Sequence, residues 1–186
     1  MFFTFEFKEM SKYQYELEYE LKKEVRVMNK RNQILVSLGS IFILTLVGLI
    51  KVMVGEQESL FSQRPLIVAI TTIIVIILMI MLATIINRIL IWVAQLGQQP
   101  KQKISFITSL YATSLSQVPF AIINLFLVMV LNLYKIDNQV AGVLSSVTAA
   151  LLYILILHQV IPISKRTVII YILVSLFFAI VMMLLL

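Results

Sequence analysis

The chain has no cysteine, which excludes disulfides, thiolate metal sites and cysteine nucleophiles. Histidine occurs once, at His158, and none of the nine Asp and Glu residues lies within a long apolar run. An intramembrane metalloprotease needs clustered His and acidic ligands. A serine hydrolase needs a base beside its serine. An ion-coupled transporter or channel usually has charged relays in its spans. We therefore expect a protein without enzyme activity, cofactor, metal or ion pathway.

Charge is scarce and apolar residues dominate. The 186 residues are 61% hydrophobic and 13% charged, whereas a soluble domain is about 25% charged. Five apolar runs reach the roughly 18–20 residues that cross a bilayer core. They cover about residues 33–54, 65–94, 104–131, 140–161 and 167–186. The sequence thus predicts an all-α integral membrane protein, with five transmembrane helices in one bundle (33–186) and no cleavable signal peptide.

Basic residues predict how the chain lies in the membrane. They gather before the first run, between the second and third, and between the fourth and fifth, whereas the other loops hold fewer and include acids. The positive-inside rule therefore predicts a cytoplasmic amino terminus and an outer carboxyl terminus. The net charge of +6 then faces anionic lipid rather than nucleic acid. We expect a multi-pass protein of the cell membrane, and the composition favours a bacterial plasma membrane.

Residues 1–32 form a predicted cytoplasmic arm, with an amphipathic helix over about residues 11–30. Glu and Lys favour helix, and one helical stripe is apolar: Tyr13, Leu17, Leu21, Val25 and Met28. A strand-like alternation of aromatic residues competes with this interpretation. The helix could lie on the membrane or dock a cytoplasmic partner, and the sequence leaves both roles open.

The third run carries the most polar side chains. They recur near every fourth residue and predict a polar face within the membrane: Ser109, Thr113, Ser116, Gln117, Pro119 and Asn124. We expect Pro119 to interrupt the helix and free a carbonyl one turn earlier. The face could be a seam of hydroxyls bonded to sister helices. It could instead be a hydrophilic groove for a lipid headgroup or peptide, or a hinge at Pro119.

Two further groups of residues are predicted from position. Small residues of the fourth run let helices approach closely and predict a packing surface: Gly142, Ser145, Ser146 and Ala149. Residues at the cytoplasmic interface are Arg88, Trp92, His158, Lys165 and Arg166. There the Arg88 side chain is expected to reach lipid phosphate, and Trp92 suits the headgroup region.

The last three runs resemble the Yip family of small five-span membrane proteins over about residues 104–186. The motifs are Phe106 opening the third span, Tyr111-Ala112 before the mid-span Pro119, and Ser164-Lys165-Arg166 before the last span. The resemblance implies a non-enzymatic membrane adaptor. Eukaryotic members are associated with vesicle trafficking and small GTPases, and some bacterial members accompany ABC exporters of peptides or toxins.

We therefore predict an accessory subunit of a bacterial membrane complex, an ABC-type exporter being the leading case. It would act by helix packing and by docking of the arm, with a permease or ATPase subunit and the lipid bilayer as partners. The alternative is a stand-alone lipid- or peptide-binding membrane protein, such as a bacteriocin-immunity or lipid-handling factor. That protein would use the groove beside Ser109, Thr113, Gln117 and Pro119.

Overall fold

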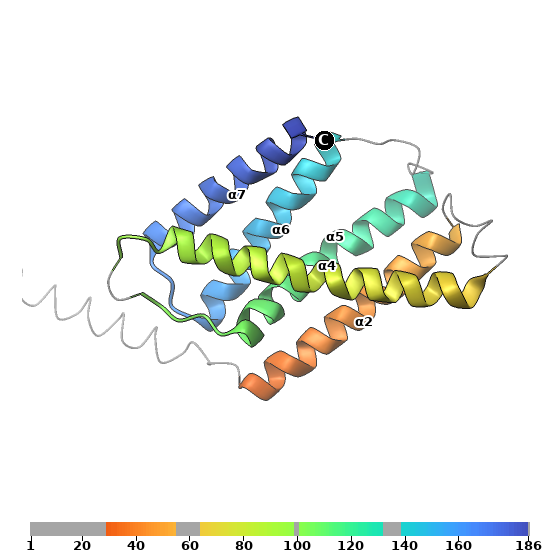
Figure 1. Ribbon diagram of the computed structural model, residues 1–186, viewed down its shortest axis with the longest axis horizontal. Helices are drawn as coiled ribbons and strands as arrows, with labels where there is room; N and C mark the ends of the chain where they lie inside the picture. The colour runs from red at the N-terminus through yellow and green to blue at the C-terminus, as the bar shows by residue number, and fades with distance from the viewer. Residues whose placement is uncertain (1–28, 55–63, 99–100, 132–138, 186) are drawn as a thin grey trace, which may run out of the picture.

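A computed structural model describes residues 29–54, 64–98, 101–131 and 139–185, which fold into five α-helices with no strand among them (Figure 1). The helices are α2 (Lys30–Val54), α4 (Pro65–Ala94), α5 (Phe106–Leu131), α6 (Gln139–Val160) and α7 (Lys165–Leu185). The all-α prediction is confirmed for this part of the chain. The predicted docking stripe of the arm, Tyr13 to Met28, lies outside the described residues.

Helix α4 has the bounds that the sequence predicts, because both ends carry strong local signals. Pro65 is its first residue, where the missing N–H has no intrahelical partner to lose. At the other end the Gln95 N–H donates to the Ile91 carbonyl at 3.1 Å. Gly97 follows at φ +76°, a left-handed conformation that glycine adopts without steric cost. This turn starts the link to α5.

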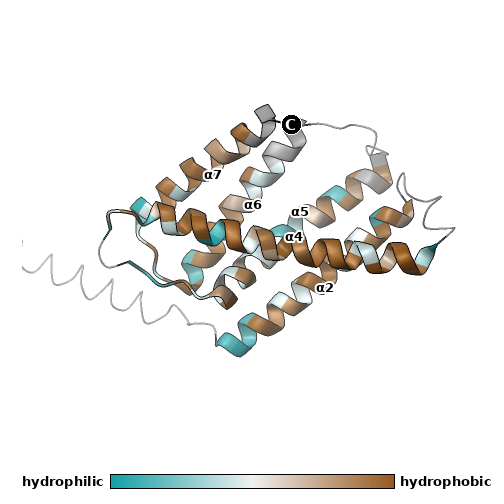
Figure 2. Ribbon diagram, viewed as in Figure 1, coloured by the Kyte–Doolittle hydropathy of each residue, from teal (hydrophilic) through white to brown (hydrophobic). Residues whose placement is uncertain are grey.

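Within the described ranges three helices are long and apolar enough to cross a membrane, namely α2, α4 and α5. The 30 residues of α4 span about 45 Å at 1.5 Å per residue, which exceeds a hydrocarbon core of about 30 Å. Large apolar side chains face outward, with Leu66 72% and Phe177 69% exposed, and the helices are predominantly hydrophobic in Figure 2. Water would disfavour so large an apolar surface. The protein is therefore membrane-associated.

The helices pack around α5. Helix α5 contacts α2, α4 and α6, while α4 also contacts α2 and α7, and α6 contacts α7 (Figure 1). In the described residues α2 contacts neither α6 nor α7. The main buried apolar cluster includes side chains from α4, α5, α6 and α7: Ile91, Ala94, Ile104, Ala112, Tyr153, Ile154, Leu157, Ile163 and Tyr171.

Pro119 does not interrupt its helix, contrary to the sequence prediction. Helix α5 continues from Phe106 to Leu131 with Pro119 inside it, and the proline side chain is exposed. A helical proline leaves the carbonyl four residues earlier, at Leu115, without its N–H donor. One missing hydrogen bond is thus tolerated within an otherwise regular helix.

Helix ends that carry most of the described cations lie together. The start of α2, the end of α4, the start of α5, the end of α6 and the start of α7 lie at one side of the molecule (Figure 1). This side, the basic end, carries Lys30, Arg31, Arg88, Lys101, Lys103, Lys165 and Arg166, and Figure 2 shows its hydrophilic colouring. Lys51 and Arg64 lie at the opposite helix ends.

Candidate functional site

Asn87 links three helices through one amide side chain. Its Nδ2 donates to Thr113 Oγ1 of α5 at 3.1 Å, and its Oδ1 accepts from the Tyr171 hydroxyl of α7 at 2.9 Å. Thr113 and Tyr171 are fully buried. Because buried polar groups are costly without partners, these two bonds stabilise the arrangement of α4, α5 and α7.

Tyr153 extends this set of contacts to α6. Its hydroxyl lies 3.0 Å from Ser109 Oγ, and its ring centroid lies 5.5 Å from that of Tyr171. Ser109 Oγ is also 3.4 Å from the Thr84 carbonyl oxygen of α4. We call the six residues the central polar cluster: Thr84, Asn87, Ser109, Thr113, Tyr153 and Tyr171.

The chemistry of the central polar cluster is that of neutral hydrogen bonding. It holds hydroxyls and one amide, and no described residue places a carboxylate or imidazole in hydrogen-bond contact with them. A hydroxyl becomes an effective nucleophile only with an adjacent base or a lowered pKa. Among the described residues no group of three or more His, Cys, Asp or Glu could hold a metal ion. This arrangement favours a structural role for the cluster.

The predicted polar face of α5 divides into parts with different surroundings. Ser109 and Thr113 belong to the central polar cluster, and Ser116 is buried with its hydroxyl donating to the Thr113 carbonyl at 2.9 Å. Gln117 is half-buried, whereas Asn124 is exposed, as is Pro119. The residues of the predicted face therefore differ in burial: those near the start of α5 are buried against other helices, and Asn124 near its end is exposed.

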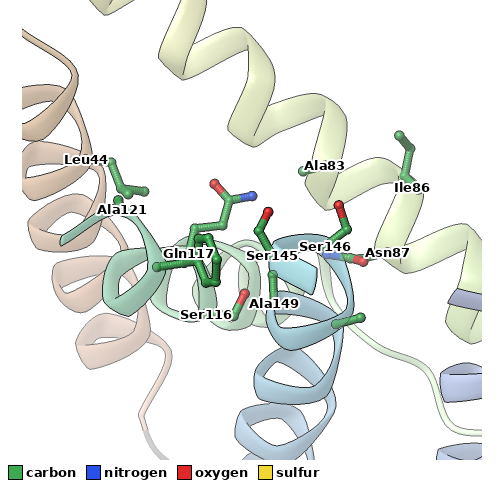
Figure 3. Close-up of a pocket in the computed structure, with 12 residues that line it drawn as sticks. Leu44, Ala83, Ile86, Asn87, Ser116, Gln117, Ala121, Ser145, Ser146 and Ala149 are labelled. Carbon is green, nitrogen blue, oxygen red and sulfur yellow. The ribbon is translucent and has the colours of Figure 1, made fainter. Parts of the chain in front are cut away.

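A cavity of about 370 Å³ lies beside the central polar cluster, between α2, α4, α5 and α6 (Figure 3). Its volume is at the lower end of the range for small-molecule pockets, about 300–1,000 Å³. The lining residues are Leu44, Ala83, Ile86, Asn87, Ser116, Gln117, Phe120, Ala121, Ser145, Ser146, Ala149 and Ala150. The groove predicted beside Ser109 and Thr113 is thus closed by packing there, and open space begins at Ser116.

Small residues of α6 line this cavity. Ser145, Ser146 and Ala149, which the sequence assigned to helix packing, all line it, and Figure 3 labels them together with Gln117. The Gln117 amide and the Ser145 hydroxyl form no hydrogen bond with a described residue. Gly142 lies in the first turns of α6, where the structure describes no side chains.

Gln98 joins two connections at the basic end. Its Oε1 accepts hydrogen bonds from Ser164 Oγ at 2.9 Å and from Thr167 Oγ1 at 2.8 Å. The link between α4 and α5 is thereby fixed to the turn between α6 and α7. Both connections meet at the side that carries most of the described cations.

The predicted interface residues lie on the surface at this end. Arg88, Trp92, His158, Lys165 and Arg166 are all exposed. Arg88 and Trp92 also line a second hollow of about 330 Å³, together with Ile85, Ile89 and Phe106. Arg88 and Trp92 therefore share a pocket, whereas His158, Lys165 and Arg166 do not line it.

Sequence reasoning missed four members of the central polar cluster, namely Thr84, Asn87, Tyr153 and Tyr171. Thr84, Tyr153 and Tyr171 are each flanked by apolar residues, and Asn87 precedes Arg88 within the apolar run of α4. Polar groups placed so deep in an apolar helix usually face a neighbouring helix. The partners, however, lie as many as 84 positions away in the chain.

No protein-family model, curated protein or solved structure matches this chain. The resemblance to the Yip family remains a prediction that rests on the motifs quoted above.

Proposed function

We propose that this protein is a non-enzymatic accessory subunit of a membrane complex, and that it binds a partner helix through α4. The observation that carries the proposal is an uninterrupted row of exposed apolar side chains, the α4 stripe. Its residues recur every fourth position: Leu66, Ile70, Ile74, Leu78 and Leu82. Successive residues of this row are one turn apart and each is displaced by about 40° around the helix axis, so the row is an inclined ridge of the kind that fits the groove of a neighbouring helix.

The arrangement of α4 supports this proposal. Only 6% of its most apolar window is buried, although α4 contacts α2, α5 and α7. Much of the surface along that part of the helix is therefore free. Lipid could cover this surface, but the ridge of Leu and Ile also gives a second, inclined helix a surface for van der Waals packing.

The proposed topology has five spans in one bundle, with a cytoplasmic amino terminus. Its support is the joint location of seven described cations at the basic end, against Lys51 and Arg64 at the opposite helix ends. Cytoplasmic loops carry such an excess of Lys and Arg. Residues 1–32 then face the cytoplasm, where the arm docks a second subunit.

An exporter of peptides or toxins is the complex to which we assign the protein. This part of the proposal rests on the Yip resemblance of residues 104–186, and the partners would be a permease or an ATPase. The bacterial plasma membrane is the proposed location.

Purification of the tagged full chain in mild detergent, at native expression, tests the proposal by mass spectrometry. We expect a stoichiometric membrane partner, and loss of that partner in the triple variant Ile74→Ala, Leu78→Ala, Leu82→Ala. The matched control removes one Ile and two Leu from an exposed face of α7: Ile169→Ala, Leu173→Ala and Leu176→Ala. Recovery of the protein alone, or equal loss in both variants, would contradict the proposal.

A second candidate function is binding of a lipid-soluble molecule or a hydrophobic peptide in the 370 Å³ cavity. It is favoured by the Gln117 amide and Ser145 hydroxyl, which offer hydrogen bonds among apolar and small polar lining residues. Organic extraction of the purified protein, followed by mass spectrometry, should identify a neutral compound that Gln117→Leu depletes. Asn124→Leu is the control, because Asn124 is exposed on the same helix. Equal yields from the two variants would argue against a cavity ligand.

A further inference from the structure

The pocket around Arg88 combines one cation with four apolar walls. It has a volume of about 330 Å³ and lies between the last turns of α4 and the first residue of α5. The walls are Ile85, Ile89, Trp92 and Phe106. The apolar side chains can contact the apolar part of a ligand while the guanidinium pairs with an anionic group. The pocket therefore suits a ligand with an apolar body and an anionic head.

The guanidinium of Arg88 has no acidic partner in the described residues. No Asp or Glu occurs between Glu58 and Asp137 in the sequence, and the structure shows no hydrogen bond or ion pair of Arg88 with a described residue. The guanidinium carries five N–H donors in a planar fork that matches phosphate oxygens. The pairing would be charge-assisted and could be bidentate.

The depth of Arg88 fits a lipid phosphate. Arg88 lies six residues before Ala94, or about 9 Å along the helix axis from the end of α4. An arginine side chain at that depth extends to the headgroup region while its methylenes stay in the apolar layer. Trp92, one turn nearer the end, is a residue type enriched at the same level.

The charge around the pocket distinguishes between lipid classes. Lys101 and Lys103 are exposed in the link that leads to Phe106. Together with Arg88 they disfavour the ammonium of a zwitterionic headgroup. An anionic headgroup gains roughly 1 kcal/mol from each basic residue near the membrane surface.

We infer that the Arg88 pocket is a binding site for an anionic glycerophospholipid. Its phosphodiester pairs with the Arg88 guanidinium, and the upper part of an acyl chain lies against Ile85, Ile89 and Phe106. The α4 residues of this site follow the last residue of the α4 stripe, Leu82, in the chain. Lipid and a partner helix therefore bind to different segments of α4.

Native mass spectrometry of the full chain tests this site. The protein is reconstituted with equal amounts of phosphatidylglycerol and phosphatidylcholine, then released gently and weighed with its retained lipid. We expect the wild-type protein to keep one phosphatidylglycerol in preference to phosphatidylcholine. Arg88→Gln should lower that retention about fivefold, the factor that about 1 kcal/mol gives. Arg166→Gln, an exposed cation at the same end but outside the pocket, should retain lipid as the wild type does.

Two further variants separate charge, shape and folding. Arg88→Lys keeps the charge but loses the planar fork, so its retention should fall between wild type and Arg88→Gln. Phe106→Ala keeps Arg88 and removes a wall, and it should weaken retention of long-chain lipid more than short-chain lipid. Circular dichroism must show the helix content of wild type in each variant. Equal retention in Arg88→Gln and Arg166→Gln, or equal retention of both lipids by wild type, would overturn the inference. Displacement of the lipid by millimolar inorganic phosphate would assign the site to free phosphate instead.

Discussion

Replacement of Asn87 by Leu should destabilise the protein by about 1–3 kcal/mol. Leu has the same branched arrangement of side-chain heavy atoms as Asn, but it removes the donor to Thr113 and the acceptor for Tyr171 together. Hydrogen bonds between membrane helices contribute about 0.6 kcal/mol on average and up to about 1.7 kcal/mol. The variant also leaves the hydroxyls of Thr113 and Tyr171, both fully buried, without these partners.

A double-mutant cycle isolates one of the two bonds. Tyr171→Phe removes only the hydroxyl that donates to Asn87 Oδ1 at 2.9 Å. We expect the double variant to cost less than the sum of the single variants, by about 0.6–1.7 kcal/mol. The free energy of unfolding is measured by circular dichroism during titration of mild-detergent micelles with a denaturing detergent.

The control for this cycle is Thr72→Val. The Thr72 hydroxyl donates to the Val68 carbonyl of its own helix at 2.8 Å, so its loss breaks no contact between helices. We expect a smaller change than for Asn87→Leu. Additivity of Asn87→Leu and Tyr171→Phe within about 0.3 kcal/mol would refute the claim that this bond holds α4 to α7.

Four other substitutions test local geometry, three by the same unfolding assay and one by proteolysis. Gly48→Ala should destabilise the contact of α2 with α4, because an added Cβ meets the Ile76 side chain. Its control, Gly39→Ala, should be neutral or slightly stabilising, because the added Cβ meets only open space. Gly97→Ala should cost about 1–2 kcal/mol, since alanine is disfavoured at φ +76°; an unchanged stability would argue against that turn. Gln98→Leu removes the shared acceptor at the α6–α7 turn and should speed proteolysis there, with unchanged cleavage as the contrary result.

Helix positions were predictable where local chemistry marks them. Pro65 and Gly97 bracket α4, so its predicted and observed bounds agree. The starts of α5 and α7 differ from prediction by two residues, because hydropathy changes gradually where a loop becomes a helix. The sequence could not foresee that Pro119 would sit inside a continuous helix, since the neighbouring turns compensate for one lost bond.

For the candidate site, the sequence predicted which side chains share a helix face, but not which neighbouring residues they contact. The four-residue period of Ser109, Thr113 and Gln117 correctly places them on one side of a helix. Which neighbour each residue meets depends on packing between segments far apart in the chain. That packing pairs Ser109 with Tyr153 and leaves Gln117 at the cavity, and no local pattern distinguishes the two outcomes.

The contacts of α2 set an order for its packing. Helix α2 buries Gln33, Ser37 and Ser40. The Ser37 hydroxyl donates to the Gln33 carbonyl within α2, whereas the Gln33 side chain accepts a hydrogen bond from Thr108 of α5, 75 positions later in the chain. The pairing of α2 with α5 is therefore completed only after those residues have been synthesised.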